Sequence, residues 1–599
     1  MADPEHWAKL EDSVAAWNRW RSSLAVAPDL SDVDLSRRDL SGADLHGVDL
    51  RGVSFTGSIL LGASFREANL RGVDLTVAQR RLQTEQFAGA DLTGATLPPE
   101  LTKLYDSLQN VNNISESARK LFLAVLAACL YSWLTIATTT DVNLITNRAS
   151  SPLPIIQTSI PIVGFYWVAP LLLLCVYFYF HFYLQKLWEE LGSLPAIFPD
   201  GRPLHAKIDP WLLNDLVRAH LPKLNVSRPF LSYFQLWISV LLAWWVVPIT
   251  LFLFWGRYLP RHERAGTTFH VALLVISLTA ALALYRLAVT TLRGIERKPF
   301  TLRGTLTSLV GYQAAAFAVA VGVLFGMVSQ GAIIGVPSDA PIFGLPLRFQ
   351  RSEQDRRWQG MTRRTLVPRL MALVGFSPFA DLTGAEISQR QSPWSQKDED
   401  LNLIARARLE GADLRYAIAP RAFLADADLF VADLSGADLN SADLRRAYLS
   451  YAVLSGADLR AANIANATLF ASHLRGADLQ GADLRGANLN DADLRDASLA
   501  EDNLFHSRLR GASLENADLR GANLGDADLR SVDLGGADVS GADLTYADFR
   551  EALVLDPEAV KGGIHWDKAF YDEKILKALG LPPNHNTKLA EQQKKERKL

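Results

Sequence analysis

Cysteine is almost absent from this chain, with 2 residues among 599. Cys129 and Cys175 both lie inside apolar runs. A disulfide framework needs more cysteines than this, and a thiolate metal site needs ligands that neither run supplies. We therefore expect no disulfide framework, no metal and no cofactor.

Short catalytic motifs are also missing. The sequence has neither a G-x-x-x-x-G-K-(S/T) phosphate loop nor a G-x-S-x-G nucleophile elbow. His262-Glu263 begins like the zinc motif H-E-x-x-H, but Gly266 stands where the second His would be. The sequence therefore predicts no catalytic residues and no enzyme activity.

A strong charge of one sign is lacking as well, because the net charge is −3. This balance gives no support to a nucleic acid partner, which would require a basic surface. The distribution is uneven, however: residues 401–550 carry 23 Asp and Glu against 15 Lys and Arg, a balance of −8. The last residues, 588–599, are rich in Lys.

Long hydrophobic runs are abundant in the middle of the chain. A helix of about 20 apolar residues spans the hydrocarbon core of a bilayer, and Trp and Tyr flank several of the runs, as they do at membrane interfaces. We predict a helical transmembrane domain over 101–347, with the lipid bilayer as its partner. The candidate spans are Leu121 to Ala137, Ile160 to Leu184, Phe234 to Trp255, Phe269 to Leu292, and Leu309 to about Gly335.

The charge of the connections predicts how these spans are oriented. Segments 185–233 and 293–303 are rich in Lys and Arg, whereas 138–159 contains only Arg148. By the positive-inside rule the first two are cytoplasmic and the third is external, which places the N-terminus in the cytoplasm. Five full crossings would put the C-terminal part outside, whereas the arginines between 348 and 369 favour the inside.

Whether there are four or five spans is left open. We expect a multi-pass protein of a bacterial inner (plasma) membrane with its C-terminal part also cytoplasmic. Segment 348–404 then forms an interfacial segment and linker, with two five-residue repeats at 380–388.

The most regular feature is a period of five residues from Leu409 to Phe549. Of the 29 centres, all but Ala419 are large and apolar, and 25 of the 29 residues two positions earlier are Ala. An α-helix requires a period of 3.6 and a half-buried strand a period of 2, so the pattern indicates a solenoid whose turns bury residues against each other. Representative centres are Leu409, Leu414, Leu424, Leu429, Leu434, Leu439, Leu444, Leu479, Leu484, Leu489, Leu519 and Leu524.

The A-(D/N)-L-x-x unit resembles that of the pentapeptide-repeat family. This resemblance implies a right-handed quadrilateral parallel β-helix with the Leu and the preceding Ala pointing inward. The same unit occurs at 28–100, with a break over 76–86. The chain also resembles a bacterial subfamily of pentapeptide-repeat membrane proteins, through residues 131–140, 151–156 and 198–204.

The solenoid ends need caps, because the last coil of a solenoid is otherwise open. We expect a capping helix within 1–27, a short repeat block over 28–100, a long one over 405–555, and a capping helix followed by a basic tail over 556–599. The tail reads as solvated, although so basic a segment can also touch anionic lipid.

A few positions break the patterns. Asp502 replaces an inward Ala, and a buried carboxylate requires either a hydrogen bond or a local bulge of the coil; we favour a bulge over a ligand site. If a site exists in the repeats, the residues to examine are Ser472, His473, Asp502, His506 and Ser507. In the fourth apolar run, Arg286 is an intramembrane charge, which either has a function or extends its head group to the membrane surface.

Three functions are compatible with these features. The leading one is a non-enzymatic membrane-anchored scaffold that presents the repeats to an unknown protein partner, with a homodimer as a further possibility. The second is an acidic DNA mimic that inhibits a topoisomerase, which the arginines interspersed at 415–495 weaken. The third is a small membrane channel or transporter module.

Overall fold

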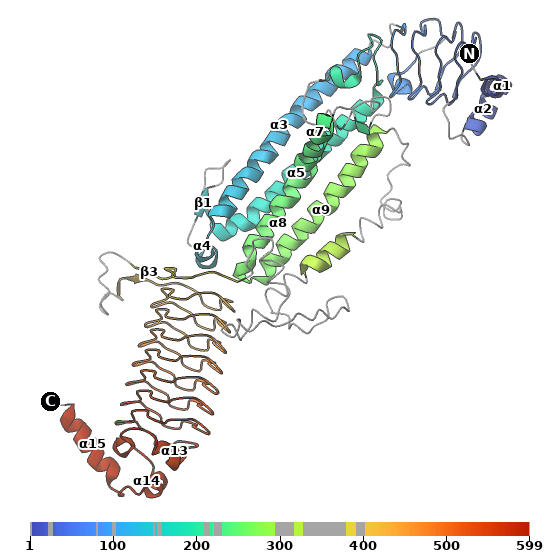
Figure 1. Cartoon of the computed structure of the whole chain (residues 1–599). Coiled ribbons are helices and arrows are strands. Elements are labelled where there is room, and N and C mark those ends of the chain that lie inside the picture. Colours follow the sequence, from blue (N-terminus) through green and yellow to red (C-terminus); the bar gives the residue numbers. More distant parts are fainter. Residues whose placement is uncertain are drawn as a thin grey trace. The chain divides into compact units, whose positions relative to one another are not determined.

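A computed structural model describes residues 3–21, 28–78, 82–98, 103–147, 150–152, 159–208, 216, 219–220, 230–293, 317–326, 379–390 and 402–597. The chain forms two compact units, which are described separately below. One comprises Met1–Leu134, Val168–Leu253 and Ala272–Val323, and the other Thr135–Trp167, Phe254–Val271 and Leu324–Leu599. Each unit contains a repeat block and segments of the long helices (Figure 1).

Four helices in the described residues are long and apolar enough to cross a membrane. They correspond to α3 (Lys103–Thr138), α5 (Ile162–Ser193), α7 (Phe230–Val240) continuing into α8 (Val246–Tyr258), and α9 (Arg264–Leu292). The first four apolar runs are thus confirmed as helices. Within the fifth run the structure describes one shorter apolar helix, Phe317–Gly326, and the remainder lies outside the described residues.

A π-helical turn, Leu241–Trp245, joins α7 to α8. Such a turn widens the helix and leaves carbonyl groups without their usual partners. Side chains of α5 supply those partners: the Tyr177 hydroxyl donates to the Trp244 carbonyl at 2.9 Å, and His181 Nε2 lies 3.1 Å from the Ala243 carbonyl oxygen. The turn therefore fixes the register between α5 and the α7–α8 helix.

The N-terminal repeat block is a stack of coils capped by two short helices. Parallel bridges join residues 20 apart, such as Asp29 with Asp49, and then 22 apart, such as Asn69 with Asp91. The two extra residues are accommodated by the 3-10 helix Thr84–Phe87. Instead of one capping helix there are two, α1 (Pro4–Asp12) and α2 (Val14–Arg21), because Ser13 between them is extended.

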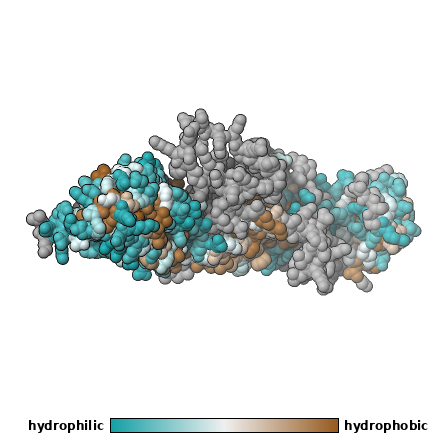
Figure 2. All heavy atoms as spheres, turned by 90° about the horizontal axis from the view of Figure 1, so that it is seen from below, coloured by the Kyte–Doolittle hydropathy of each residue, from teal (hydrophilic) through white to brown (hydrophobic). Residues whose placement is uncertain are grey.

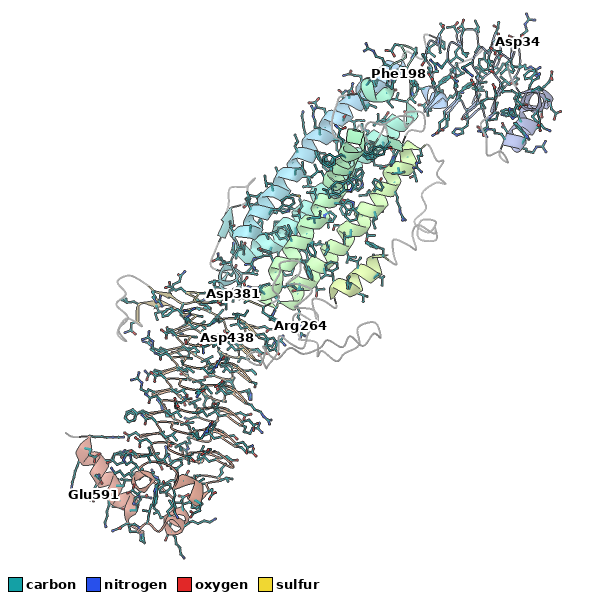
Figure 3. All side chains as sticks on the ribbon, in the orientation of Figure 1. Asp34, Phe198, Arg264, Asp381, Asp438 and Glu591 are labelled. Carbon is teal, nitrogen blue, oxygen red and sulfur yellow. The ribbon has the colours of Figure 1, made fainter. Side chains whose placement is uncertain are left out.

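The last rung of this block is not a repeat. Backbone of the connection between α5 and α7 lies along the coil that contains Asp91: Leu92 N donates to the Ile197 carbonyl at 3.1 Å and Gly94 N to the Pro199 carbonyl at 2.8 Å. Phe198, labelled beside the coils in Figure 3, is fully buried. The segment that carried part of the family resemblance therefore closes the N-terminal block.

The C-terminal repeat block is a longer stack with the same register. Asp413 bridges to Asp433, 20 residues later, and equivalent parallel bridges continue in steps of five to the pair Asp528 and Asp548. The two isolated repeats join the start of the stack, where Asp381 bridges to Ile418. The coils appear as evenly spaced loops in Figure 1. Four five-residue units therefore make one coil.

Each unit is held to the next coil by three backbone hydrogen bonds. Around Leu439, the Leu439 N donates to the Asp458 carbonyl at 2.7 Å, Ser441 N to the Arg460 carbonyl at 2.8 Å, and Asp458 N to the Ala437 carbonyl at 2.9 Å. Ser441 has a φ of 56°, in the left-handed region, where Gly, Asn and Asp are best tolerated. This explains why Gly, Asn or Asp often occupies that position.

The repeat centres form one continuous core. The 12 representative Leu centres are at most 4% exposed, and the Ala residues two positions before them are buried too, except Ala412, which is partly buried. Besides these bridges, the described residues contain only two short antiparallel strand pairs: β1 (Ser150–Pro152) with β2 (Ser159–Pro161), and β3 (Gln389–Arg390) with β4 (Ile404–Ala405).

The C-terminal end of the stack is closed by helices, including the one expected to be a solvated tail. The helices α13 (Pro557–Val560) and α14 (Glu573–Leu579) are followed by α15 (His585–Glu596). The tail expectation is wrong for this segment, because Leu589 is buried and Tyr546 donates to Glu596 at 2.6 Å. Arg597 likewise pairs with Asp526 at 2.6 Å.

We expect Leu484→Ala to lower the free energy of unfolding of the C-terminal block by about 2–5 kcal/mol, because the cavity lies where neighbouring coils cannot collapse. Arg485→Ala, at the next and largely exposed position, should cost no more than about 1 kcal/mol. Urea denaturation of the full chain in detergent, followed by hydrogen exchange of peptides from 405–555, measures both. Equal losses in the two variants would contradict an inward-facing Leu.

Candidate interaction surface

Asp and Arg form a repeated pair on the outside of the C-terminal block. Arg445 donates to Asp443 through Nε at 3.0 Å and through Nη2 at 2.8 Å. Charge-assisted pairs with two bonds are the strongest and most directional of their kind. The same pairing joins Asp413–Arg415, Asp458–Arg460, Asp483–Arg485, Asp493–Arg495, Asp518–Arg520, Asp528–Arg530 and Asp548–Arg550.

This pairing compensates the negative charge of eight outward carboxylates locally, although the block keeps its net balance of −8. The hydrogen bond from Arg495 holds the pKa of Asp493 below its ordinary value, so the pair is ionised at neutral pH. A mimic of DNA needs a row of uncompensated negative charges at phosphate-like spacing. The pairs therefore count against the DNA-mimic hypothesis.

A column of aromatic rings crosses successive coils of the same block. Tyr451 lies between Phe430 and Phe470, with ring centroids 5.8 and 5.7 Å apart in edge-to-face contacts. Tyr451 is 48% exposed, and Val431 beside Phe430 is 50% exposed. Figure 2 shows hydrophobic residues (brown) among the hydrophilic ones (teal) on the surface of the molecule. We call Phe430, Val431, Tyr451 and Phe470 the aromatic column.

The five residues singled out in the repeats do not form one site. Ser472 is buried and its hydroxyl donates to the Leu469 carbonyl at 2.7 Å. Asp502 and Ser507 are buried in the following coil, on adjacent sides. His473 and His506 point outward, and His506 Nε2 lies 3.8 Å from Asp526. In the described ranges His, Cys, Asp and Glu form no group of three that could hold a metal ion.

Asp502 is accommodated without a bulge. The bridges of Asn503 to Asp483 and to Asn523 keep the 20-residue step, and Asp502 Oδ1 accepts a hydrogen bond from Ala482 N at 2.9 Å. The bulge is therefore wrong, and the other alternative holds: a hydrogen bond from the neighbouring coil satisfies one carboxyl oxygen. Burial raises the pKa of Asp502 to about 8, against the lowering effect of that bond.

A polar groove of about 340 Å³ lies beside His506. Its arginines already have partners: Arg485 pairs with Asp483, and Arg446 donates to the Asn402 side chain at 3.0 Å. The groove therefore offers little free positive charge to an anion. It is lined by Arg445, Arg446, Asn463, Ala465, Asn466, Arg485, Gly486, Phe505 and His506.

Arg286, which the sequence predicts to be an intramembrane charge, lies on the surface of its helix. Arg286 is exposed on α9, six residues before the helix ends at Leu292. Its position so near the helix end is compatible with a side chain that reaches the membrane surface.

The opposite end of the C-terminal block contacts the connection that follows α3. The short helix α4 (Asp141–Thr146) places Val142 and Ile145 against the Leu and Ala core of the coils. Asp141 accepts a hydrogen bond from Asp381 N at 2.7 Å and forms an ion pair with Arg257 at the end of α8. Figure 3 labels Asp381 at this end of the coils. We call these contacts the docking end.

The turn between α8 and α9 completes the docking end. The buried ring of His262 has Nδ1 3.2 Å from Asp413 Oδ1, and Arg415 donates to the same carboxylate. Burial raises the pKa of Asp413, but the hydrogen bonds from Arg415 and His262 outweigh it and hold the pKa well below its usual range. The carboxylate is therefore ionised wherever the contact is intact.

Comparison with known sequences identifies the five-residue repeats in both blocks. The family model described as pentapeptide repeats matches in eight copies, over residues 29–60, 49–78, 407–446, 432–464, 462–500, 503–536 and 522–553. No curated protein matches the chain.

Solved structures of pentapeptide repeat proteins are similar to part of the chain. HetL from the cyanobacterium Nostoc sp. strain PCC 7120 is 33% identical over 28% of this chain and 84% of its own, with a TM-score of 0.16. Rfr23 from the cyanobacterium Cyanothece 51142 is 32% identical over 18% and 85%, with a TM-score of 0.15. QnrB1, a plasmid-mediated fluoroquinolone resistance protein, is 18% identical over 29% and 92%, with a TM-score of 0.16.

The family assignment rests on the sequence matches and not on the TM-scores. The matched residues 29–78 and 407–553 are those that form the coils, and HetL is 33% identical over 84% of its own length. The chain belongs to the pentapeptide-repeat family.

We expect Asp502→Ala to stabilise the C-terminal block and to change how its stability depends on pH. The unfolded carboxyl ionises near pH 4, whereas the folded one keeps its proton up to about pH 8. The free energy of unfolding should therefore fall as pH rises between these values, by about 1.4 kcal/mol per pH unit. Urea denaturation at pH 5, 6 and 7 should show this slope in the parent chain and not in the variant.

The control for this experiment is Asp438→Ala, which removes an outward carboxylate from the same kind of unit. A slope that is lost only in Asp502→Ala would assign the pH dependence to the buried position. Identical slopes for the parent chain and Asp502→Ala would show that Asp502 is ionised in the folded block.

We expect Asp141→Ala to loosen the docking end, because it leaves Arg257 without its ion-pair partner and Asp381 N without its acceptor. Hydrogen exchange in 379–390 should accelerate by at least about tenfold, the factor that corresponds to 1.4 kcal/mol of local stability. Asn143→Ala on the same helix is the matched control. Unchanged exchange in both variants would mean that Asp141 does not hold the first coil.

Proposed function

We propose that the chain is a non-enzymatic, membrane-anchored scaffold whose repeats form right-handed quadrilateral parallel β-helices. In this proposal the long C-terminal β-helix binds a protein partner. The 20-residue register and the inward Leu and Ala support the β-helix. A repeated surface without long loops suits recognition more than turnover, because catalytic residues usually lie on loops.

Exposed apolar side chains on the long helices support membrane anchoring. Leu123 is 59% exposed, Phe182 64% and Trp237 63%. In water such side chains would form a large hydrophobic patch, whereas in a bilayer they contact lipid. The helices thus have the length and the surface that a membrane requires.

The aromatic column is the observation that carries the partner-binding proposal. Tyr, Phe and Trp that are partly exposed on a rigid surface are enriched at the energetic centres of protein interfaces. The column is held in place by backbone hydrogen bonds on both sides, such as Tyr451 N to the Phe470 carbonyl at 2.9 Å. It therefore needs little reorganisation to bind, which lowers the entropic cost of association.

Photo-crosslinking tests the proposal on the full chain in its own membrane. A photoreactive residue placed at Tyr451 should yield a defined crosslinked protein after detergent extraction, and Phe430→Ala should reduce the yield by about tenfold or more. The same probe at Gln480, two sides away on the coil, is the control and should yield none. Crosslinks to a second copy would identify a homodimer as the partner.

A chain that is washed from membranes without detergent, or that yields the same crosslinks from both probe positions, would contradict the scaffold proposal. Turnover of a substrate by the purified protein would contradict it as well.

A further inference from the structure

We propose that the C-terminal repeat block stands on the side of the membrane reached by α4 and by the turn between α8 and α9, and that this is the non-cytoplasmic side. The inference rests on the proposed membrane anchoring. It uses contacts inside one compact unit, together with the alternation that successive membrane-crossing helices impose.

The two connections concerned lie together. The helix α4 begins at Asp141, directly after α3 ends at Thr138, and the 3-10 turn Leu259–Arg261 with His262 links α8 to α9. Arg261 Nη1 donates to the Leu144 carbonyl at 2.7 Å. Both connections therefore emerge at one face of the bundle, as the first and third connections of an up-and-down arrangement must.

Those connections cover the open end of the C-terminal coils. Val142 and Ile145 pack against the core of the stack, Asp141 accepts the Asp381 amide, and His262 contacts Asp413. An uncovered coil end would expose a row of unpaired backbone groups and apolar core. If the repeats stood on the other side of the membrane, the coil end would lose this cover and Asp141 would lose its contact with the Asp381 amide.

Alternation then requires one more crossing. Helix α9 starts at Arg264 on the docking side and ends at Leu292 on the other, so the chain must return before Asp381. The fifth apolar run, 309–335, is available for this crossing. Its described helix Phe317–Gly326 packs on the bundle: the ring of Phe325 lies 4.8 Å from that of Trp255, and a Cβ at Gly322 would lie 3.6 Å from Val275.

Charge assigns the sides. The docking-side connection 138–159 carries one basic residue, Arg148, whereas 185–233 carries Lys186, Arg202, Lys207, Arg218, Lys223 and Arg228. The positive-inside rule makes the docking side non-cytoplasmic. The arginines at 348–369 argued for the opposite side. Only Arg348 and Arg351 lie within about 20 residues of the end of the fifth run, where the rule applies; the others lie further into the long C-terminal segment, and long segments are translocated largely regardless of charge.

The side of the membrane limits which partners the C-terminal block can bind. The aromatic column and the Asp–Arg pairs then face a protein outside the cytoplasm, and a cytoplasmic topoisomerase could not reach them. The N-terminal block precedes α3 and so belongs to the cytoplasmic side. The two blocks would therefore serve partners in different compartments.

Cysteine labelling tests the assignment in the full chain. In a Cys129→Ala, Cys175→Ala background, one reporter is Gln480→Cys on an exposed position of the C-terminal block and the other is Thr56→Cys on an exposed position of the N-terminal block. A membrane-impermeant maleimide applied to intact cells or spheroplasts should label Gln480→Cys to the same extent before and after permeabilisation. Thr56→Cys should be labelled only after it.

Equal labelling of the two cysteines before permeabilisation, whether high or low, would overturn the assignment, as would labelling of Thr56→Cys alone. Fractionation of the same cells separates this failure from failure of the scaffold proposal. A chain that stays in alkali-washed membranes with Gln480→Cys protected refutes only the sidedness, whereas a chain released by the wash refutes membrane anchoring and the inference with it.

Discussion

The backbone ladder between coils is the constraint on which the rest of the molecule depends. In the regular part of each stack, a five-residue unit donates to and accepts from the coil 20 residues away, as the Leu439 amide does with the Asp458 carbonyl at 2.7 Å. This pairing fixes the width of the coil, and the width decides which side chains fit inside: one Leu and one Ala for each side. The outward residues are consequently free to vary, and the binding surface can change while the core stays constant.

The period of five sufficed to predict the coils, because a repeat that buries residues only against itself needs no information from elsewhere in the chain. Of the five apolar runs, four likewise predicted the long helices that the structure describes, since lipid imposes length and composition directly. Features that depend on contacts between distant segments were not accessible in this way. Ile197 closes the N-terminal block through its backbone carbonyl. Every residue has such a carbonyl, so the side-chain pattern of the sequence does not predict this contact.

Contacts between distant segments also explain the wrong predictions for the C-terminal helix and for Asp502. The Lys-rich segment reads as solvated because its apolar residues are few, yet α15 is held by polar contacts to Tyr546 and Asp526. For Asp502 the sequence left a hydrogen bond and a bulge open, and only the 20-residue register shows that the amide of Ala482 faces its carboxylate. For the candidate surface, the spacing predicted which residues point outward, whereas the stacking of Phe430, Tyr451 and Phe470 across coils required the 20-residue step.

The coil register has a consequence for how such a molecule can change its length. Because four units complete a coil, duplicating 20 residues would lengthen the stack by about 4.8 Å and leave the last helices above the same edge. Duplicating five would turn the last coils, together with α15 and its contacts to Tyr546 and Asp526, a quarter of the way round relative to the first coil. Growth in whole coils therefore keeps the outward sides of the stack aligned with the docking end, whereas growth in single units turns them away from it, which gives the molecule a natural increment of size.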